Sequence, residues 1–115
     1  YIYTIEDSSQ SLGGLYNELK SGTLADIGIY SLNRHKHIHC GEGGICVTNN
    51  DKLAERICLI RNHGEAVVDG MEVENISNLI GFNYRMTEIE AAIANEQLKK
   101  LDYFLYQFSF YVTTH

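Results

Sequence analysis

The sequence predicts an α/β fold, in which helices flank a small sheet, and two kinds of segment support this. Apolar runs rich in β-branched or aromatic residues, which are typical of strands, occupy 1–5, 27–32 and 45–48. Two segments with helix signals follow, from Asn49 or Asn50 to about Arg61 and from Thr87 to about Leu101. Strands followed by helices indicate a layered α/β domain, and 115 residues are enough for one domain with a modest core.

The first expected strand, Tyr1 to Ile5, is predicted to be buried and runs into a polar stretch, Glu6-Asp7-Ser8-Ser9-Gln10. Ligands of open α/β sheets bind at the carboxyl ends of strands, so Asp7 is a candidate ligand-binding residue. The alternative is that Asp7 caps a helix or forms an Asx-turn. The glycine-punctuated segment 12–26 is then expected to form a short strand and turn.

A lysine-bearing loop separates the second expected strand, Ile27 to Leu32, from the third, Ile45 to Thr48. The loop contains Lys36 and ends in the turn Gly41-Glu42-Gly43-Gly44. This order of elements would present one amine at the mouth of the sheet. A lysine in such a place can act as a Schiff-base nucleophile, whereas most loop lysines are simply solvated.

The first expected helix has Leu53, Ile57 and Ile60 at the spacing of one apolar face, which is predicted to pack on the sheet. Gly64 is placed to end this helix. The segment 65–79 has no clear period and is expected to be an exposed loop.

Thr87 and Glu90 have the spacing of a capping box, which predicts the start of the second helix. The segment 103–112 is nearly all aromatic or aliphatic and has neither a helix nor a strand period. Two interpretations are open for it: a strand covered by further protein, or non-native sequence beyond a truncation or frameshift.

Composition narrows the function classes. The net charge of -6 argues against nucleic acid or an anionic membrane surface as the main partner, because both require basic patches. No apolar run has the length of a membrane span, and the first residues do not resemble a signal peptide. Cys40, Cys46 and Cys58 form no CxxC pair, which favours a cytoplasmic location.

Three kinds of chemistry are weakly indicated in the loop. His35, His37 and His39 alternate before Cys40 and could bind a metal if the segment were a strand, but no carboxylate or second cysteine completes the ligand set. Cys40 beside His39 could be a nucleophile, although no local signature supports this. The turn 41–44 could hold a phosphate, but it lacks the Lys-Ser/Thr of a P-loop and precedes a strand. We expect no metal site here.

A fourth interpretation combines Asp7, Gln10, Ser31 and Lys36 in a pyridoxal phosphate pocket. That cofactor needs an amine, a carboxylate beside its ring nitrogen, a donor to its ring oxygen, and hydroxyl or amide donors for its phosphate. All of these groups occur at the ends of two successive expected strands. From the chemistry alone, this is one plausible set among several.

Several motifs resemble those of the DegT/DnrJ/EryC1/StrS aminotransferases. In chain order they are Glu6-Asp7-Ser8-Ser9-Gln10-Ser11, Ser21-Gly22-Thr23-Leu24-Ala25-Asp26-Ile27-Gly28, Ser31-x4-Lys36-x4-Gly41-Glu42-Gly43-Gly44, Leu53-Ala54-Glu55-Arg56, Arg61-Asn62-His63-Gly64 and Gly81-Phe82-Asn83-Tyr84-Arg85-Met86-Thr87-Glu88-Ile89. The resemblance implies a partial fold-type-I large domain, like that of aspartate aminotransferase, with a sheet flanked by helices. It covers residues 1–102 as the central part of the pyridoxal-phosphate-binding large domain, and 103–115 is expected to be a tail unlike the family.

The resemblance also implies site residues. Lys36 matches the Schiff-base lysine, Asp7 the partner of the pyridinium nitrogen, and Gln10 the donor to the ring oxygen. Ser31 matches a phosphate ligand. Asn83 matches an asparagine that reaches the phosphate of the neighbouring subunit, which implies a homodimer with shared active sites.

The implied reaction is amino transfer, usually from glutamate, to a keto-deoxy sugar carried on a nucleotide, for surface polysaccharide or natural-product sugars. Two alternatives remain. The chain could be a truncated, non-catalytic remnant of such an enzyme, or a sugar dehydratase of the same family. Lys36 argues against the second, because the dehydratases carry histidine at that position.

Overall fold

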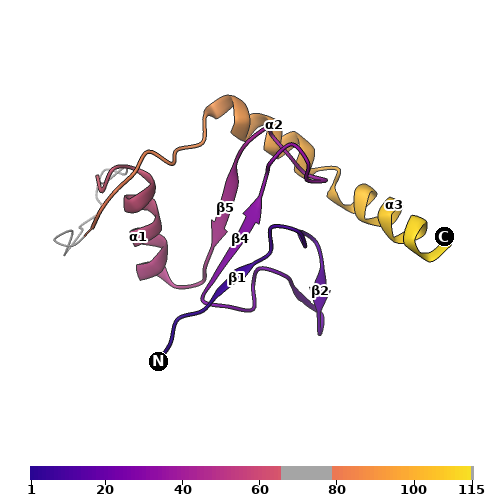
Figure 1. The fold of residues 1–115 in the computed structure, drawn as a ribbon, viewed down its shortest axis with the longest axis horizontal. Coiled ribbons are helices and arrows are strands. Elements are labelled where there is room, and N and C mark those ends of the chain that lie inside the picture. Colours follow the sequence, from indigo (N-terminus) through magenta and orange to yellow (C-terminus); the bar gives the residue numbers. More distant parts are fainter. Residues whose placement is uncertain (66–78, 115) are drawn as a thin grey trace.

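The computed structural model describes residues 1–65 and 79–114 and contains a three-stranded sheet (Figure 1). Its strands are β1 (Ile5–Asp7), β4 (Ile27–Ser31) and β5 (Gly44–Val47), in the order β1-β4-β5. β4 runs parallel to β1 and antiparallel to β5. The carboxyl ends of β1 and β4 therefore lie at the same edge of the sheet, as the α/β prediction requires.

The connection between β1 and β4 forms a small hairpin of β2 (Leu15–Tyr16) and β3 (Leu19–Lys20). Its two turn residues, Asn17 and Glu18, have φ angles of 47° and 66°. Positive φ at both central positions is the mark of a type I′ turn, whose twist suits a two-residue hairpin. The prediction of a short strand and turn in this segment is confirmed.

The first helix, α1 (Asp51–Arg61), is confirmed and lies beside β5 (Figure 1). The side chain of Asn50 caps it by accepting from the N–H groups of Lys52 (3.0 Å) and Leu53 (3.3 Å). At the other end, the Gly64 N–H donates to the Leu59 carbonyl (2.7 Å) and Gly64 has a φ of 77°. Gly64 therefore ends the helix in a Schellman-like turn, as predicted.

The second helix, α2 (Glu88–Leu98), begins with the predicted capping box, in which the Thr87 hydroxyl and the Glu90 carboxylate each accept from the other's backbone N–H. The helix ends before Leu101, where the sequence predicted its end. A third helix, α3 (Leu101–Thr114), then extends away from the sheet (Figure 1). The interpretation of the aromatic segment as a strand is therefore wrong.

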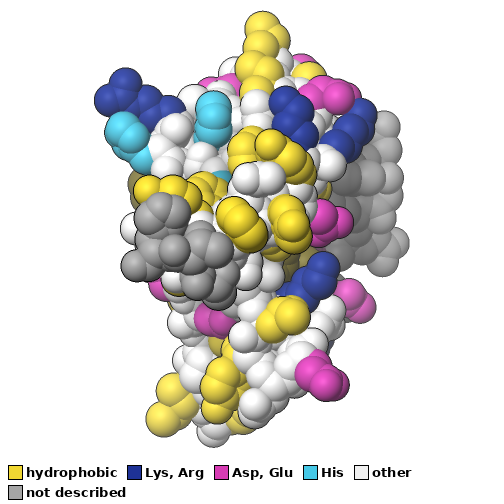
Figure 2. Space-filling model, turned by 90° about the vertical axis from the view of Figure 1, so that its right-hand side faces the viewer, with side chains coloured by type: hydrophobic (Ala, Val, Ile, Leu, Met, Phe, Trp, Pro, Cys, Tyr) yellow, Lys and Arg dark blue, Asp and Glu magenta, His cyan; other side chains and the backbone are white. Residues whose placement is uncertain are grey.

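Helix α3 forms because its residues find partners at helical spacing. Leu101 and Phe104 pack against the core, and Leu105 lies on Gly13, where a Cβ would come within 2.6 Å of Leu105 Cδ1. Much of the remaining helix surface is apolar and exposed, as Figure 2 shows for the face over α3. Tyr103 and Tyr106 are 63% and 67% exposed.

The core lies under the loop that follows β4. Its buried residues are Leu32, Ile38 and Cys40. Partly buried residues from the Gln10 turn and from the second half of the chain pack against them, namely Leu12, Met86, Ala94, Leu101 and Phe104. The loop that carries Lys36 is thus anchored on both sides of the lysine.

The first strand differs from its prediction. Strand pairing covers Ile5–Asp7, and the residues before it are exposed, with Tyr1 at 99%. Asp26 holds this lead-in segment by accepting from the Tyr1 hydroxyl (2.6 Å) and the Thr4 N–H (2.8 Å). The β-branched and aromatic composition indicated an extended segment but not burial, which needs a packing partner that these residues lack among the described residues.

The second and third strands differ from their predicted limits by one residue. β4 ends at Ser31 and β5 starts at Gly44, and the Leu32 N–H still donates to the Gly43 carbonyl (2.8 Å) beyond the last strand pair. The expected exposed loop 65–79 falls almost entirely outside the described residues. Across the described ranges, the helices are too short or too polar for a membrane span.

Candidate functional site

The loop between β4 and β5 is fixed by its own backbone. The Leu32 N–H donates to the Gly43 carbonyl (2.8 Å), and the Arg34 N–H donates to the Gly41 carbonyl (2.7 Å). These bonds close the loop at its base and leave Lys36 in its outer part. Leu32 and Ile38 are 2% and 1% exposed, so buried side chains hold both arms of the loop.

The glycine turn is needed for this closure. A Cβ at Gly43 would lie 2.8 Å from Met86 Cε and 3.1 Å from Cys40 Sγ, so a larger residue would fit only if the Met86 side chain moved. Gly41 has a φ of 102°, which favours glycine for conformational reasons. The turn at 41–44 therefore shapes the lysine loop, and the strand that follows gives no helix N-terminus for a phosphate.

Lys36 and Gln10 meet at the edge where β1 and β4 end. The Lys36 Nζ donates to the Gln10 Oε1 at 2.6 Å, across 26 residues of sequence. Gln10 follows β1, and Lys36 follows the parallel neighbour β4. The strand order thus brings these two predicted site residues together.

Asp7, the last residue of β1, lies next to them. Its Oδ1 accepts from the Ser9 hydroxyl (2.5 Å) and from the Ser9 N–H (3.0 Å). The Ser9 hydroxyl, then the Ser9 N–H, lower the pKa of Asp7, and the charge of Lys36 lowers it further. Asp7 is therefore ionised at neutral pH, within the electrostatic range of Lys36. In the described hydrogen bonds, its Oδ2 is left open.

Ser31 and Asn83 are placed differently. Ser31 ends β4, and its Oγ accepts from the Asn33 N–H (3.3 Å), which forms a local turn. Asn83 is exposed and pairs through its backbone with Asn62 at the end of α1. None of the described hydrogen bonds joins Asn83 to Lys36, Gln10 or Asp7.

The histidines do not form a metal site in the described ranges, where no three side chains of His, Cys, Asp or Glu are close enough to hold an ion. The segment is a series of turns, so the alternation does not put the imidazoles on one face. His35 Nε2 accepts from Arg34 Nε (3.2 Å), and His37 Nε2 lies 3.0 Å from the Leu12 carbonyl.

Cys40 is a buried residue of the core. It is 8% exposed, and its thiol donates to the Glu42 carbonyl (3.2 Å). Burial raises the pKa of Cys40, with smaller contributions from the charges of Glu90 and Glu42. A buried thiol with a raised pKa is a poor nucleophile, so the second weak interpretation of the loop is not supported.

Sequence reasoning missed the role of Glu6. Its carboxylate accepts from the Gly22 N–H (2.6 Å) and the Leu24 N–H (2.9 Å). These bonds, with Gly22 the larger cause, lower the pKa of Glu6. Glu6 thereby fastens the segment before β4 to the sheet, next to Asp7. The only signal in the sequence was its place directly before Asp7 at a strand end.

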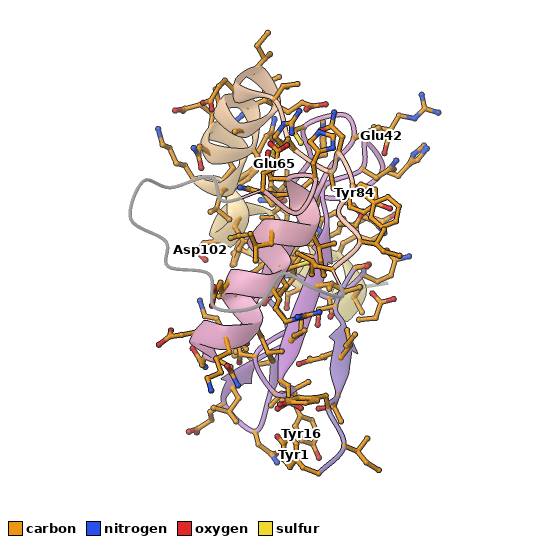
Figure 3. All side chains as sticks on the ribbon, turned by 90° about the vertical axis from the view of Figure 1, so that its left-hand side faces the viewer. Tyr1, Tyr16, Glu42, Glu65, Tyr84 and Asp102 are labelled. Atoms are coloured by element: carbon orange, nitrogen blue, oxygen red, sulfur yellow. The ribbon has the colours of Figure 1, made fainter. Side chains whose placement is uncertain are left out.

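The three groups of the site come from the segments that follow two parallel strands. Figure 3 shows Glu42 of the glycine turn in the upper part of the view and Tyr1 of the lead-in segment at the bottom. The three neighbouring polar groups form an amine, an amide and an ionised carboxylate at a strand edge. This set can bind an aldehyde through the amine and a protonated heterocycle through the carboxylate.

A family model described as the DegT/DnrJ/EryC1/StrS aminotransferase family matches residues 1–111. The chain belongs to this family. The match runs beyond Asp102, where the motifs found in the sequence end. The family's aminotransferases depend on pyridoxal phosphate, and the α/β model corresponds to part of their large domain.

Among curated relatives, the UDP-4-amino-4,6-dideoxy-N-acetyl-beta-L-altrosamine transaminase of Campylobacter jejuni is 39% identical over 105 residues, which cover 89% of this chain. Among solved structures, Helicobacter pylori PseC, an aminotransferase involved in the biosynthesis of pseudoaminic acid, has a TM-score of 0.76 and 37% identity over 89% of this chain. GDP-4-keto-6-deoxy-D-mannose-3-dehydratase of E. coli, with bound hydrated PLP, has a TM-score of 0.73 and 31% identity over 88% of this chain.

The chain spans a small part of each of these proteins. It covers 27% of the Campylobacter transaminase, 27% of PseC and 29% of the dehydratase. The range that the family model matches, 1–111, contains Asp7, Gln10 and Lys36.

Proposed function

We propose that this chain is the lysine-bearing part of a pyridoxal-phosphate-dependent aminotransferase that acts on a nucleotide-linked keto sugar. The observation that carries the proposal is the contact of Lys36 Nζ with Gln10 Oε1, beside the ionised carboxylate of Asp7. Three groups that this cofactor requires are close together in one chain, although they come from two separate strand ends.

The donor set fits the cofactor. Lys36 would hold it through Nζ, and the open Oδ2 of Asp7 would face its ring nitrogen. Gln10 keeps its amide N–H groups for the ring oxygen, because its Oε1 is the atom used by Lys36. Ser31 would contribute to the phosphate site with its hydroxyl.

When bound, the cofactor would supply an electron sink for the bond changes at the amino donor. The chain's own residues would then orient and move protons. Asp7, ionised at neutral pH, would hold the proton on the ring nitrogen. Lys36 Nζ would take a proton from the α-carbon of the donor, since a free amine near a carbon acid is a general base. In the second half of the reaction it would give a proton to the sugar carbon that receives the amino group.

The substrates and partners are proposed from the family. The amino donor is glutamate, and the acceptor is a nucleotide-linked keto-deoxy sugar for surface polysaccharide or natural-product sugars. The relatives' names, a UDP-sugar transaminase among them, support this class. We place the protein in the cytoplasm as a homodimer, in which Asn83 reaches the phosphate of the neighbouring subunit. Asn83 is exposed and has no hydrogen bond to Lys36 among the described ones, which is compatible with that role.

The test uses the full chain and added pyridoxal phosphate. A new visible absorbance band is expected, and it should be lost in Lys36→Ala. Lys52→Ala is the matched control, because Lys52 is an exposed lysine on α1. After borohydride reduction, peptide mass spectrometry should find the cofactor on Lys36.

Three outcomes would overturn the proposal for this chain. They are no band in the unaltered protein, an unchanged band in Lys36→Ala, or labelling spread evenly over Lys20, Lys52 and Lys99. The first would favour a non-catalytic remnant. Dehydration of a keto sugar without amino transfer, by the loaded protein, would instead favour a dehydratase.

A further inference from the structure

His37 lies where the lysine loop meets the turn that follows β1. Its Nε2 is 3.0 Å from the backbone carbonyl of Leu12. His37 directly follows Lys36, and Leu12 comes two residues after Gln10. One contact therefore links the two segments whose side chains meet at Lys36 Nζ and Gln10 Oε1.

The chemistry of this contact fixes its direction. A backbone carbonyl only accepts hydrogen bonds, so His37 Nε2 must carry the proton. Both the neutral tautomer with a proton on Nε2 and the imidazolium satisfy this requirement. The link between the loop and the turn is therefore kept whether His37 is charged or neutral.

Helix α3 covers the same junction. The ring of Phe108 meets the ring of His37 edge-on, with centroids 6.1 Å apart and planes at 74°. Leu105, one turn earlier, lies on Gly13 next to Leu12. Figure 2 shows histidine and hydrophobic side chains on this face of the molecule. The helix thus holds His37 and the turn together from outside.

We propose that His37 is a positioning residue, which holds the lysine loop against the Gln10 turn so that Lys36 Nζ reaches Gln10 Oε1. The effect of His37 on catalysis rests on the proposed function, because the direction of the Lys36 amine matters only if Lys36 binds the cofactor. The positioning itself is a property of the free chain and can be measured without the cofactor.

The chain offers a matched control in His35, on the other side of Lys36. His35 is exposed, and its Nε2 accepts from the neighbouring Arg34 rather than linking the loop to another segment. Substitution of His35 changes the same kind of side chain at the same distance along the chain from Lys36. It leaves the junction with Leu12 intact.

The experiment measures how fast each lysine of the full chain reacts with limiting acetic anhydride, by peptide mass spectrometry. In His37→Phe, which keeps a ring beside Phe108 but has no donor, Lys36 should react up to about fivefold faster, the population change that one net hydrogen bond gives. Lys52 should be unchanged. His37→Gln, which keeps a donor, should restore the original rate at Lys36, and His35→Phe should not change it.

Equal Lys36 rates in the unaltered protein and His37→Phe would overturn the proposal, as would a rate in His37→Gln as high as in His37→Phe. Higher rates at all lysines in His37→Phe would show that this substitution disturbs the fold. His37→Met would then be used instead, and it should likewise raise the rate at Lys36 and leave the rate at Lys52 unchanged. A failure of the proposed function is seen separately, as the absence of a cofactor band in the unaltered protein, and it leaves the acetylation result intact.

Discussion

Two neighbouring carboxylates, Glu6 and Asp7, end β1 on opposite faces of the strand and have different surroundings. Glu6 accepts from the backbone N–H groups of Gly22 and Leu24, which belong to the segment before β4. Asp7 accepts only from Ser9 in the described hydrogen bonds, through one oxygen, and faces the charge of Lys36. The comparison shows that the carboxylate on one face of β1 holds another segment of the fold, whereas the carboxylate on the other face keeps one oxygen without a partner among the described hydrogen bonds.

The face of Glu6 is also the more tightly packed one. A Cβ at Gly28, the β4 residue opposite Glu6, would collide with the carbonyl of Gly22. The Tyr30 hydroxyl donates to the Ser21 carbonyl (2.7 Å) on the same segment. Burial, then the charge of Glu6, raise the pKa of Tyr30. Substitutions on the Glu6 face of the sheet would therefore disturb packed segments, whereas substitutions on the Asp7 face would remove few contacts.

The largest expected effect comes from Gly28→Val. The new side chain cannot avoid the backbone of the segment held by Glu6, so we expect a loss of about 3 kcal/mol in the free energy of unfolding, at the upper end for overpacked positions. Urea unfolding measures it. Gly41→Ala is the control, since a Cβ there meets no atom within 4 Å and only the positive φ is costly. It should cost about 1 kcal/mol. Equal costs would contradict the packing comparison.

A crossed pair of substitutions, Glu6→Gln and Asp7→Asn, should separate the two carboxylates. Glu6→Gln should lower the free energy of unfolding of the cofactor-free chain more than Asp7→Asn does, because Glu6 holds two backbone donors of another segment. Asp7→Asn should instead weaken pyridoxal phosphate binding about tenfold, the usual value of a hydrogen bond to a charged group.

Urea unfolding and cofactor titration are measured on both variants. The comparison fails if one substitution produces both losses and the other neither. If the double variant shows the loss of stability of Glu6→Gln together with the loss of cofactor binding of Asp7→Asn, the two carboxylates act independently.

The smallest expected effect is that of Ser9→Ala on the titration of Asp7. Because the Ser9 hydroxyl is the largest cause of the lowered pKa, its removal should move the pKa of Asp7 up toward the ordinary value of 3.8. The lowered pKa means that the stability contributed by Asp7 is present above 3.8 and is lost as the pH falls through the folded value. Ser9→Ala should therefore reduce the acid dependence of unfolding.

Carboxyl-carbon NMR titration of Asp7 follows this change directly, with Asp26 as the internal reference. Asp26 has a lowered pKa from an unrelated partner, the Tyr1 hydroxyl. An unchanged titration of Asp7 in Ser9→Ala would show that the charge of Lys36, rather than Ser9, dominates its environment.

The sequence predicted the proximity of the site residues because it depends on strand order. Polar residues after two parallel strands meet at one edge, and Gln10 and Lys36 do so although 26 residues separate them. Local signals also predicted both helix starts and the end of α1 correctly, since the contacts of Asn50, Thr87 and Gly64 span only a few residues. The end of α2 at Leu98 was not predicted. The roles of the site residues in catalysis stay predictions.

The sequence could not predict features that depend on segments folding back. The bonds of Glu6 to Gly22 and Leu24 exist only because the segment after the β2–β3 hairpin returns to β1. The helical state of α3 depends on Phe104 and Leu105 finding the core and Gly13, which its composition does not reveal. The exposure of Tyr1 likewise reflects the absence of a packing surface among the described residues rather than any property of the side chain.

The place of β4 between two partner strands has a consequence for how the molecule opens. Exchange of all its amide protons with solvent requires both ladders to break, because its N–H groups point alternately to β1 and β5, whereas the β2–β3 hairpin is held by one short ladder. Deuterium uptake should therefore be slowest in Ile27–Ser31 and fast in Leu15–Lys20. The loop that carries Lys36 continues directly from this strand, so Lys36 should stay in place while the edges of the chain open and close.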